Sequence, residues 1–144
     1  MQKAKRPSHL SILGAAAAAF VVGALWYSPL LFGEAAMRLR GLDPRALGEL
    51  TVPPGMLAAE FVRELLAAYV LARLVGLLEV ADWKAAVGLA AWIWIGFPAT
   101  LLAGSVMWEN VPWQLAAIHG ADWFVKIVVM AAILGAWSKT REDR

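Results

Sequence analysis

The sequence predicts an all-α membrane protein with four transmembrane helices. Hydrophobic residues make up 61% of the 144 residues and charged residues only 17%, against about 45–50% and about 25% in soluble domains. Four apolar stretches each approach the roughly 20 residues that cross a bilayer. A chain of this length forms one domain. We expect the single transmembrane domain to cover 1–144, with spans at about 10–31, 56–78, 85–107 and 113–137.

Within these spans, two local patterns bear on packing. Ala15, Ala19 and Gly23 recur every four residues in the 10–31 span, and a stripe of small residues lets another helix approach closely. Gly96-Phe97-Pro98 interrupts the 85–107 span, because proline removes a backbone donor and kinks a helix. Short turns join the last three spans, so we expect 56–78 and 85–107 to form an antiparallel hairpin.

One long polar connection, 33–55, separates the first two spans. We expect a short helix over 34–40 and a second one after the Asp43-Pro44 cap, running to Leu50. Leucines alternate there with Arg38, Arg40 and Arg45, which is typical of a segment lying on the membrane surface. The connection is therefore predicted to be a surface helical segment on the extracytoplasmic side.

The distribution of basic residues predicts the orientation. If both termini lie on one side of the membrane, that side carries seven Lys and Arg residues outside the spans and the other side carries three. The positive-inside rule then places both termini in the cytoplasm. The seven are Lys3, Lys5, Arg6, Lys84, Lys139, Arg141 and Arg144, and the three are Arg38, Arg40 and Arg45.

Aromatic residues near the predicted span ends agree with this topology. Trp and Tyr favour the membrane–water interface, and Trp92, Trp94 and Trp123 remain at depth, where an indole N–H needs a partner. The predicted interfacial anchors are Trp26, Tyr27, Trp83, Trp108, Trp113 and Trp137.

Ionisable residues inside two of the spans form the candidate site. His119, Asp122 and Lys126 lie within about 60° of one another on one helix face. Such groups cost several kcal/mol in hydrocarbon unless they are paired or hydrated. The 56–78 span carries a matching face at a similar depth, and we expect the two faces to meet. We call the set the polar seam: Glu60, Arg63, Glu64, His119, Asp122 and Lys126.

The seam allows specific pairings and three kinds of function. We expect Arg63 near Asp122 and Glu64 within reach of Lys126. Three carboxylates against two cations leave one surplus negative charge, which would hold a proton or bind a cation. The alternatives are a salt-bridge network that fixes helix register, a proton- or cation-linked site, and a metal site. The metal site would use His119, Asp122, Glu60 and Glu64, but Arg63 among them opposes it.

Several function classes are excluded or unsupported. The chain has no cysteine, which rules out disulfides, thiolate catalysis and cysteine-bound metals. No nucleophile elbow, phosphate loop, zinc-protease motif or dinucleotide fingerprint occurs. The basic residues lie at span ends, so they do not indicate nucleic acid. We therefore predict no cofactor, no resident metal and no enzymatic activity.

Three segments resemble a known family. Gly23-Ala-Leu-Trp-Tyr-Ser-Pro-Leu-Leu-Phe-Gly33, Trp108-Glu-Asn-Val-Pro-Trp113 with Ile118-His-Gly120, and Val129–Trp137 resemble a bacterial four-helix membrane family known as domain of unknown function 1761. The resemblance implies four spans, a bacterial inner membrane and no established activity. Glu60, Arg63, Glu64, Asp122 and Lys126 match none of its motif positions, which implies a role peculiar to this branch.

From these observations we expect a non-enzymatic integral membrane protein, a subunit or assembly protein whose helices pair through the polar seam. Its expected partners are membrane lipids and either further copies of itself or a larger membrane complex. The alternative is a small proton- or cation-linked transporter with an outward-opening polar site between the 56–78 and 113–137 spans. A membrane enzyme is a more distant alternative.

Overall fold

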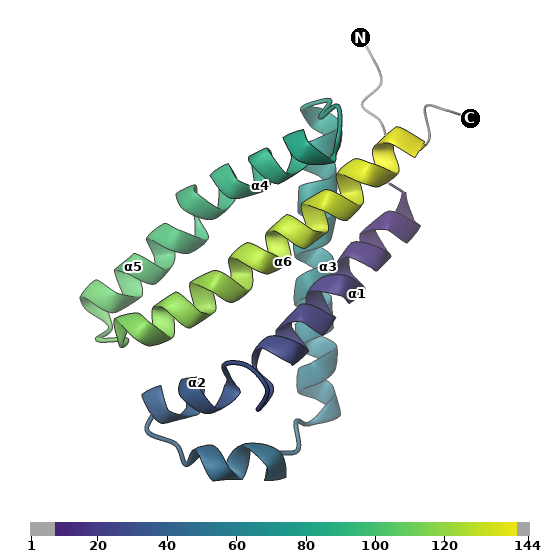
Figure 1. The fold of residues 1–144 in the computed structure, drawn as a ribbon. Coiled ribbons are helices and arrows are strands. Elements are labelled where there is room, and N and C mark those ends of the chain that lie inside the picture. The colour runs from purple at the N-terminus through teal and green to yellow at the C-terminus, as the bar shows by residue number, and fades with distance from the viewer. Residues whose placement is uncertain (1–7, 141–144) are drawn as a thin grey trace.

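The computed structural model describes residues 8–140, and their side chains as far as residue 137. All regular structure in this range is helical, as the sequence predicts (Figure 1). The elements are α1 (His9–Trp26), α2 (Gly33–Leu39), a 3₁₀ helix η1 (Pro44–Glu49), α3 (Pro54–Leu77), α4 (Trp83–Gly96), α5 (Pro98–Trp108) and α6 (Trp113–Thr140).

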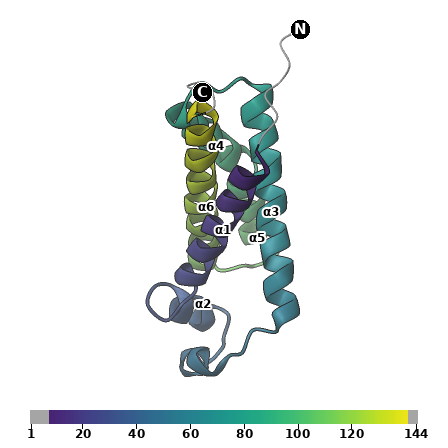
Figure 2. The ribbon, with the colours of Figure 1, turned by 90° about the vertical axis from the view of Figure 1, so that its right-hand side faces the viewer.

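The long helix α6 is the centre of the arrangement. It packs against α4 along one side and against α1 along the other, and α3 packs on α1 and also contacts α6 (Figures 1 and 2). The beginning of α1 and the end of α6 lie at the same end of the molecule. The sequence predicts that the second and third spans, here α3 and α4, pack against each other as a hairpin. This prediction is wrong, because α4 packs mainly on α6 rather than on α3.

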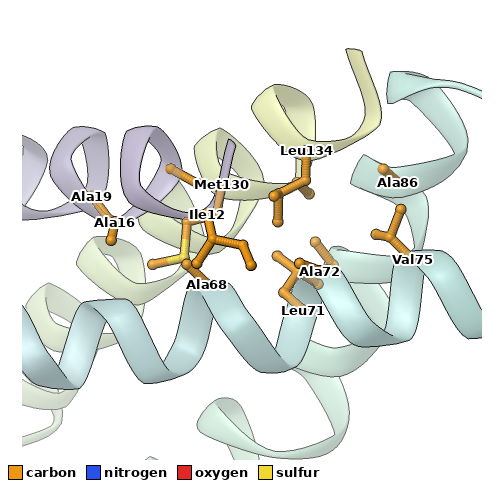
Figure 3. Close-up of a cluster of buried hydrophobic side chains, with 13 residues drawn as sticks. Ile12, Ala16, Ala19, Ala68, Leu71, Ala72, Val75, Ala86, Met130 and Leu134 are labelled. Carbon is orange, nitrogen blue, oxygen red and sulfur yellow. The ribbon is translucent and has the colours of Figure 1, made fainter. Parts of the chain in front are cut away.

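Small residues explain why these helices pack so closely. In α1, Ala15, Ala16 and Ala19 are fully buried, which confirms the predicted small-residue face. In Figure 3 this face continues through Ile12 to Met130 of α6 and Ala68 of α3, and the same cluster extends to Leu134 and, at its far end, to Ala86 of α4. At the α4–α6 crossing, Gly135 lies so close to Trp83 and Ala86 that an added Cβ would clash with both. Helix faces built from alanine and glycine thus bring three helices against α6.

Within residues 8–140, three helical segments, not four, are long and apolar enough to cross a membrane. They are His9–Trp26, the joined α4–α5 segment Trp83–Trp108, and Trp113–Trp137. The 24-residue helix α3 is also long enough, but Glu60, Arg63, Glu64 and Arg73 give it more charge than such a segment carries. The sequence-based count of four spans is therefore corrected to three on length and composition.

The first helix ends earlier than predicted, at Trp26 rather than near residue 31. Pro29 has no backbone N–H to continue the helix, and the chain turns instead. The Phe32 N–H donates to the Trp26 carbonyl at 2.9 Å and the Gly33 N–H to Ser28 at 3.1 Å. The two short helices that follow, α2 and η1, confirm the predicted helices of this connection, and its position on a membrane surface stays a prediction. The Asp43 side chain caps η1 by accepting from the Arg45 N–H at 2.9 Å.

The predicted break in the third span is confirmed at Phe97, which separates α4 from α5. Pro98 takes the first position of α5, where a missing N–H is tolerated. The Thr100 hydroxyl lies 2.9 Å from the carbonyls of both Gly96 and Phe97. Thr100 therefore compensates for the break by donating to these two carbonyls.

Candidate functional site

The two charged faces of the polar seam meet at Lys126, which confirms that α3 and α6 face each other. The Nζ atom of Lys126 lies 2.8 Å from Glu64 Oε1 and 3.1 Å from Asp122 Oδ2. Glu60 Oε1 lies farther away, at 3.6 Å. Lys126 and Asp122 are each almost fully buried, and Glu64 is completely buried. One ammonium group is thus held between carboxylates from both helices.

The local sequence explains the burial of these groups. Glu64 lies one helical turn before Ala68 and Lys126 one turn before Met130, and both apolar residues belong to the core cluster. The polar contacts therefore continue the packed face of each helix. On α1, a Cβ added to Gly23 would lie 2.8 Å from both Cε and Nζ of Lys126. The absence of a side chain at Gly23 creates the space that the lysine occupies.

Arg63 lies elsewhere than predicted. Its guanidinium donates to Glu60 Oε1 at 3.1 Å on the same helix and stacks over the Trp123 ring at 5.3 Å. Both Arg63 and Glu60 are partly exposed. Asp122 pairs with Lys126 one turn along α6 instead. The expected Arg63–Asp122 pair is therefore wrong, because a partner three residues away on α3 is closer to Arg63.

Two carboxylate oxygens in this cluster have no hydrogen-bond partner. They are Glu64 Oε2 and Asp122 Oδ1, both fully shielded from solvent. An unsatisfied buried oxygen costs about 1–3 kcal/mol, and more when the group is charged. The other oxygen of each carboxylate contacts Lys126 Nζ. The centre of the seam therefore has unused acceptor capacity and more negative than positive groups.

His119 lies one helical turn before Asp122 on α6 and has partners that the sequence did not indicate. The Tyr27 hydroxyl is hydrogen-bonded to His119 Nδ1, and Arg40 Nη2 lies 3.3 Å from His119 Nε2. A guanidinium can only donate, so Nε2 accepts and the imidazole is neutral. Nδ1 then carries the proton and donates to the Tyr27 oxygen. Tyr27, predicted as a membrane anchor, thus serves as the partner of His119.

Two indoles hold the backbone around His119. Trp26 Nε1 donates to the Ile118 carbonyl at 3.1 Å, and Trp94 Nε1 donates to the Gly120 carbonyl at 2.9 Å. The expectation that the Trp94 indole N–H has a partner is confirmed. Trp26, like Tyr27, lies against α6, and the interfacial position of both stays a prediction. The segment Gly23–Gly33 that resembles the family therefore docks on the second resembling segment, Ile118–Gly120.

The remaining predicted anchors keep the exposure that a membrane-interface role requires. Trp108 and Trp113 are 82% and 66% exposed, and Trp83 and Trp137 are 48% and 44% exposed. Trp92 is 74% exposed and so faces outward rather than into the protein. Their placement at an interface stays a prediction.

The arrangement argues against a metal at the seam. Among residues 8–137, no three His, Asp or Glu side chains converge in a way that suits a metal ion. The position that a metal would take between the carboxylates holds the Lys126 ammonium. A separate groove of about 570 Å³ lies between α5 and α6, with Leu102, Trp113 and Phe124 in its apolar lining. That groove holds none of the seam residues.

Gly23→Ala is expected to destabilise the protein although alanine favours helix. The new methyl would meet Cε and Nζ at the end of the Lys126 side chain and displace the ammonium from its carboxylates. Weakening hydrogen bonds to a buried charged group costs about 1–3 kcal/mol. The gain in helix propensity offsets at most about 1 kcal/mol. Gly14→Ala on the same helix is the control, because a Cβ there meets nothing within 4 Å. Thermal unfolding in detergent gives the unfolding midpoints of Gly23→Ala and Gly14→Ala. Equal midpoints for the two variants would contradict the steric role assigned to Gly23.

Tyr27→Phe is expected to cost about 1–3 kcal/mol, because the His119 Nδ1–H loses its acceptor in a half-buried position. The chain contains one other tyrosine, Tyr69, which is 48% exposed on α3. Tyr69→Phe should leave the unfolding midpoint unchanged. Chemical unfolding of both variants in the same micelles checks the difference, and a Tyr27→Phe protein as stable as the control would contradict the assigned hydrogen bond.

The fold and the seam together define a class: an all-helical protein with three helices of membrane-spanning length and composition and a buried salt-bridge cluster. The chain belongs to the family described as protein of unknown function (DUF1761), whose model matches residues 10–135. This confirms the resemblance seen in the sequence. No match was found among curated proteins or among solved structures.

Proposed function

We propose that this chain is a non-enzymatic integral membrane protein that acts as a subunit or assembly protein of a bacterial inner-membrane complex. The observation that carries the proposal is the pairing within the polar seam. Lys126 contacts three carboxylates and Arg63 contacts Glu60, so each seam cation has a counter-charge inside the same chain. Such a network holds helices in register and leaves the outward faces free for lipid and partners.

In this proposal α3 crosses the bilayer beside the other helices. Its one fully buried charge, Glu64, points at α6. Its outward face carries Val62, Leu66 and Val70, each about half exposed or more. An apolar outer face with inward ionisable groups is the arrangement that a lipid environment favours. The helix thereby complements the three more apolar segments to form a four-helix membrane unit.

The proposed orientation places both termini in the cytoplasm. The beginning of α1 and the end of α6 at the same end of the molecule support a common side for the termini (Figure 1). The count of basic residues supports the cytoplasmic side. Much of that count falls on Lys3, Lys5, Arg6, Arg141 and Arg144, which lie outside the described residues.

Native mass spectrometry of the protein extracted from its own membrane in mild detergent tests the subunit proposal. We expect a stoichiometric complex heavier than the 15.6 kDa chain, formed by further copies or by a second protein. A mass equal to one chain across detergents and protein concentrations would overturn the proposal.

A proton- or cation-linked transporter is the second candidate. The two buried oxygens without partners, Glu64 Oε2 and Asp122 Oδ1, favour it because they could accept a proton or cation. If this candidate is correct, the proton or cation flux into proteoliposomes should be lower for Glu64→Gln than for the wild type. The flux for Glu34→Gln should equal that of the wild type. Flux that is equal in all three proteins would remove this candidate.

A further inference from the structure

We propose that the centre of the polar seam is a proton-binding site at which Glu64 and Asp122 together hold one proton at neutral pH. We call these two residues the carboxyl pair. The inference concerns the chemistry of the site and is independent of whether the chain is a subunit or a transporter.

The geometry of the carboxyl pair carries the inference. Glu64 and Asp122 come from different helices, and each directs one oxygen at Lys126 Nζ, at 2.8 and 3.1 Å. The second oxygen of each has no partner and no solvent contact. The two side chains and Lys126 are 0%, 3% and 2% exposed. Two acids therefore share one cation inside the protein, with an unused oxygen on each acid.

The charge balance at this centre favours one bound proton. With both carboxyls ionised, the buried group would carry a net charge of minus one, and an uncompensated buried charge costs several kcal/mol. Carboxyls that share a site avoid this by keeping a proton. With one carboxyl protonated, the other forms a neutral ion pair with Lys126. Because both face the same ammonium, the proton belongs to the pair and not to one residue.

The surrounding charged groups do not remove the surplus. On α3, Glu60 pairs with Arg63 at 3.1 Å and also lies 3.6 Å from Lys126 Nζ, so the charges of Glu60 and Arg63 cancel and add no positive charge to the centre. His119 on α6 is neutral, because its Nε2 accepts from Arg40, which is exposed and lies against the imidazole rather than against the carboxyl pair. Tyr27, which follows α1, is a phenol and carries no charge near neutrality. The negative surplus therefore stays with the carboxyl pair.

A proton also fits the site better than a metal ion. The Lys126 ammonium already occupies the space between the two carboxylates, and a divalent cation there would face a fixed positive charge. In the part of the chain whose side chains are described, no cluster of three potential metal ligands exists. A proton needs only one of the free oxygens, Glu64 Oε2 or Asp122 Oδ1.

Infrared spectroscopy of the full-length protein in lipid bilayers tests the proposal. At neutral pH we expect the carbonyl band of one protonated carboxyl, which shifts on exchange into D₂O. Glu64→Gln and Asp122→Asn should each abolish the band, because a single remaining acid forms a neutral pair with Lys126. Glu34→Gln, which removes an exposed acid paired with Arg38, should leave the band unchanged.

Replacing the Lys126 ammonium by an uncharged side chain provides a second test of the proposal. In Lys126→Met both acids lose their counter-charge, so the protonated-carboxyl band should double. A wild-type protein without the band, or a band that persists in both Glu64→Gln and Asp122→Asn, would overturn the proposal. Neither result would alter the native mass, so a failure here is distinguishable from a failure of the proposed subunit function.

Discussion

Lys126→Met is expected to lower the free energy of unfolding by about 3–5 kcal/mol, the cost of removing one partner from a buried ion pair. Methionine has a similar length and fills the space beside Gly23, so the loss is electrostatic rather than steric. Glu64 and Asp122 would remain buried without a cation and would have to take up protons. The penalty should therefore grow as the pH rises. Unfolding in mixed micelles, monitored by far-UV circular dichroism, gives the free energy.

Arg38→Met is the control for this variant, because it removes the same charge from an exposed ion pair with Glu34 on α2. Exposed pairs contribute about 0–1 kcal/mol, so this protein should unfold close to the wild type. Equal losses in the two variants would show that Lys126 is not buried among carboxylates and would contradict the seam as described.

Gly135→Ala is expected to separate α4 from α6. An added Cβ would lie 2.6 Å from the Trp83 Cα and 2.8 Å from the Ala86 Cβ. Neither of these atoms is the end of a flexible side chain, so the helices themselves must move. Overpacking of this kind costs about 1–3 kcal/mol or more. The unfolding midpoint should fall, and protease sensitivity near the beginning of α4 should rise.

Gly88→Ala is the matched control on α4. A Cβ at Gly88 meets nothing within 4 Å, and alanine is a better helix former than glycine by up to about 1 kcal/mol. This variant should be as stable as the wild type or more stable. A Gly135→Ala protein that matches it would show that α4 and α6 do not cross closely at this point.

The pairing of Glu64 with Lys126 could be predicted from the sequence, because helix periodicity and rise fix which residues share a face and a depth. The break at Phe97 and the cap at Asp43 were predictable for a similar reason. Proline and capping side chains act on backbone groups a few residues away. Each of these features depends on local geometry within one helix or between two helices of known direction.

The environment of His119 could not be predicted in this way. Its partners Tyr27 and Arg40 lie in the segment after α1, where the chain turns after Trp26. The course of a turn is not a periodic feature, so it gives no sequence signal for contacts 79 and 92 residues away. One clue was available: Trp26 and Tyr27 adjoin Gly23, whose lack of a side chain permits close approach to α6.

The packing partner of α4 was mispredicted because a short connection suggests that neighbouring helices pair. The close contact of Gly135 with Trp83 and Ala86 instead places α4 against α6. The position of Arg63 was missed for a further reason. Helix periodicity allowed both Glu60 and Asp122 as its partners, and the acid on its own helix contacts it.

The central claim is that α3 and α6 join through the 2.8 Å contact between Glu64 and Lys126, and a double-mutant cycle tests it most directly. The free energy of unfolding should be measured for the wild type, Glu64→Gln, Lys126→Met and the double variant, with a parallel cycle in which Glu34→Gln replaces Glu64→Gln. The Glu64 cycle should give a coupling energy of about 0.5–3 kcal/mol, and the control cycle should be additive. If the Glu64 and Lys126 effects also add to within about 0.5 kcal/mol, the two helices do not meet at these side chains.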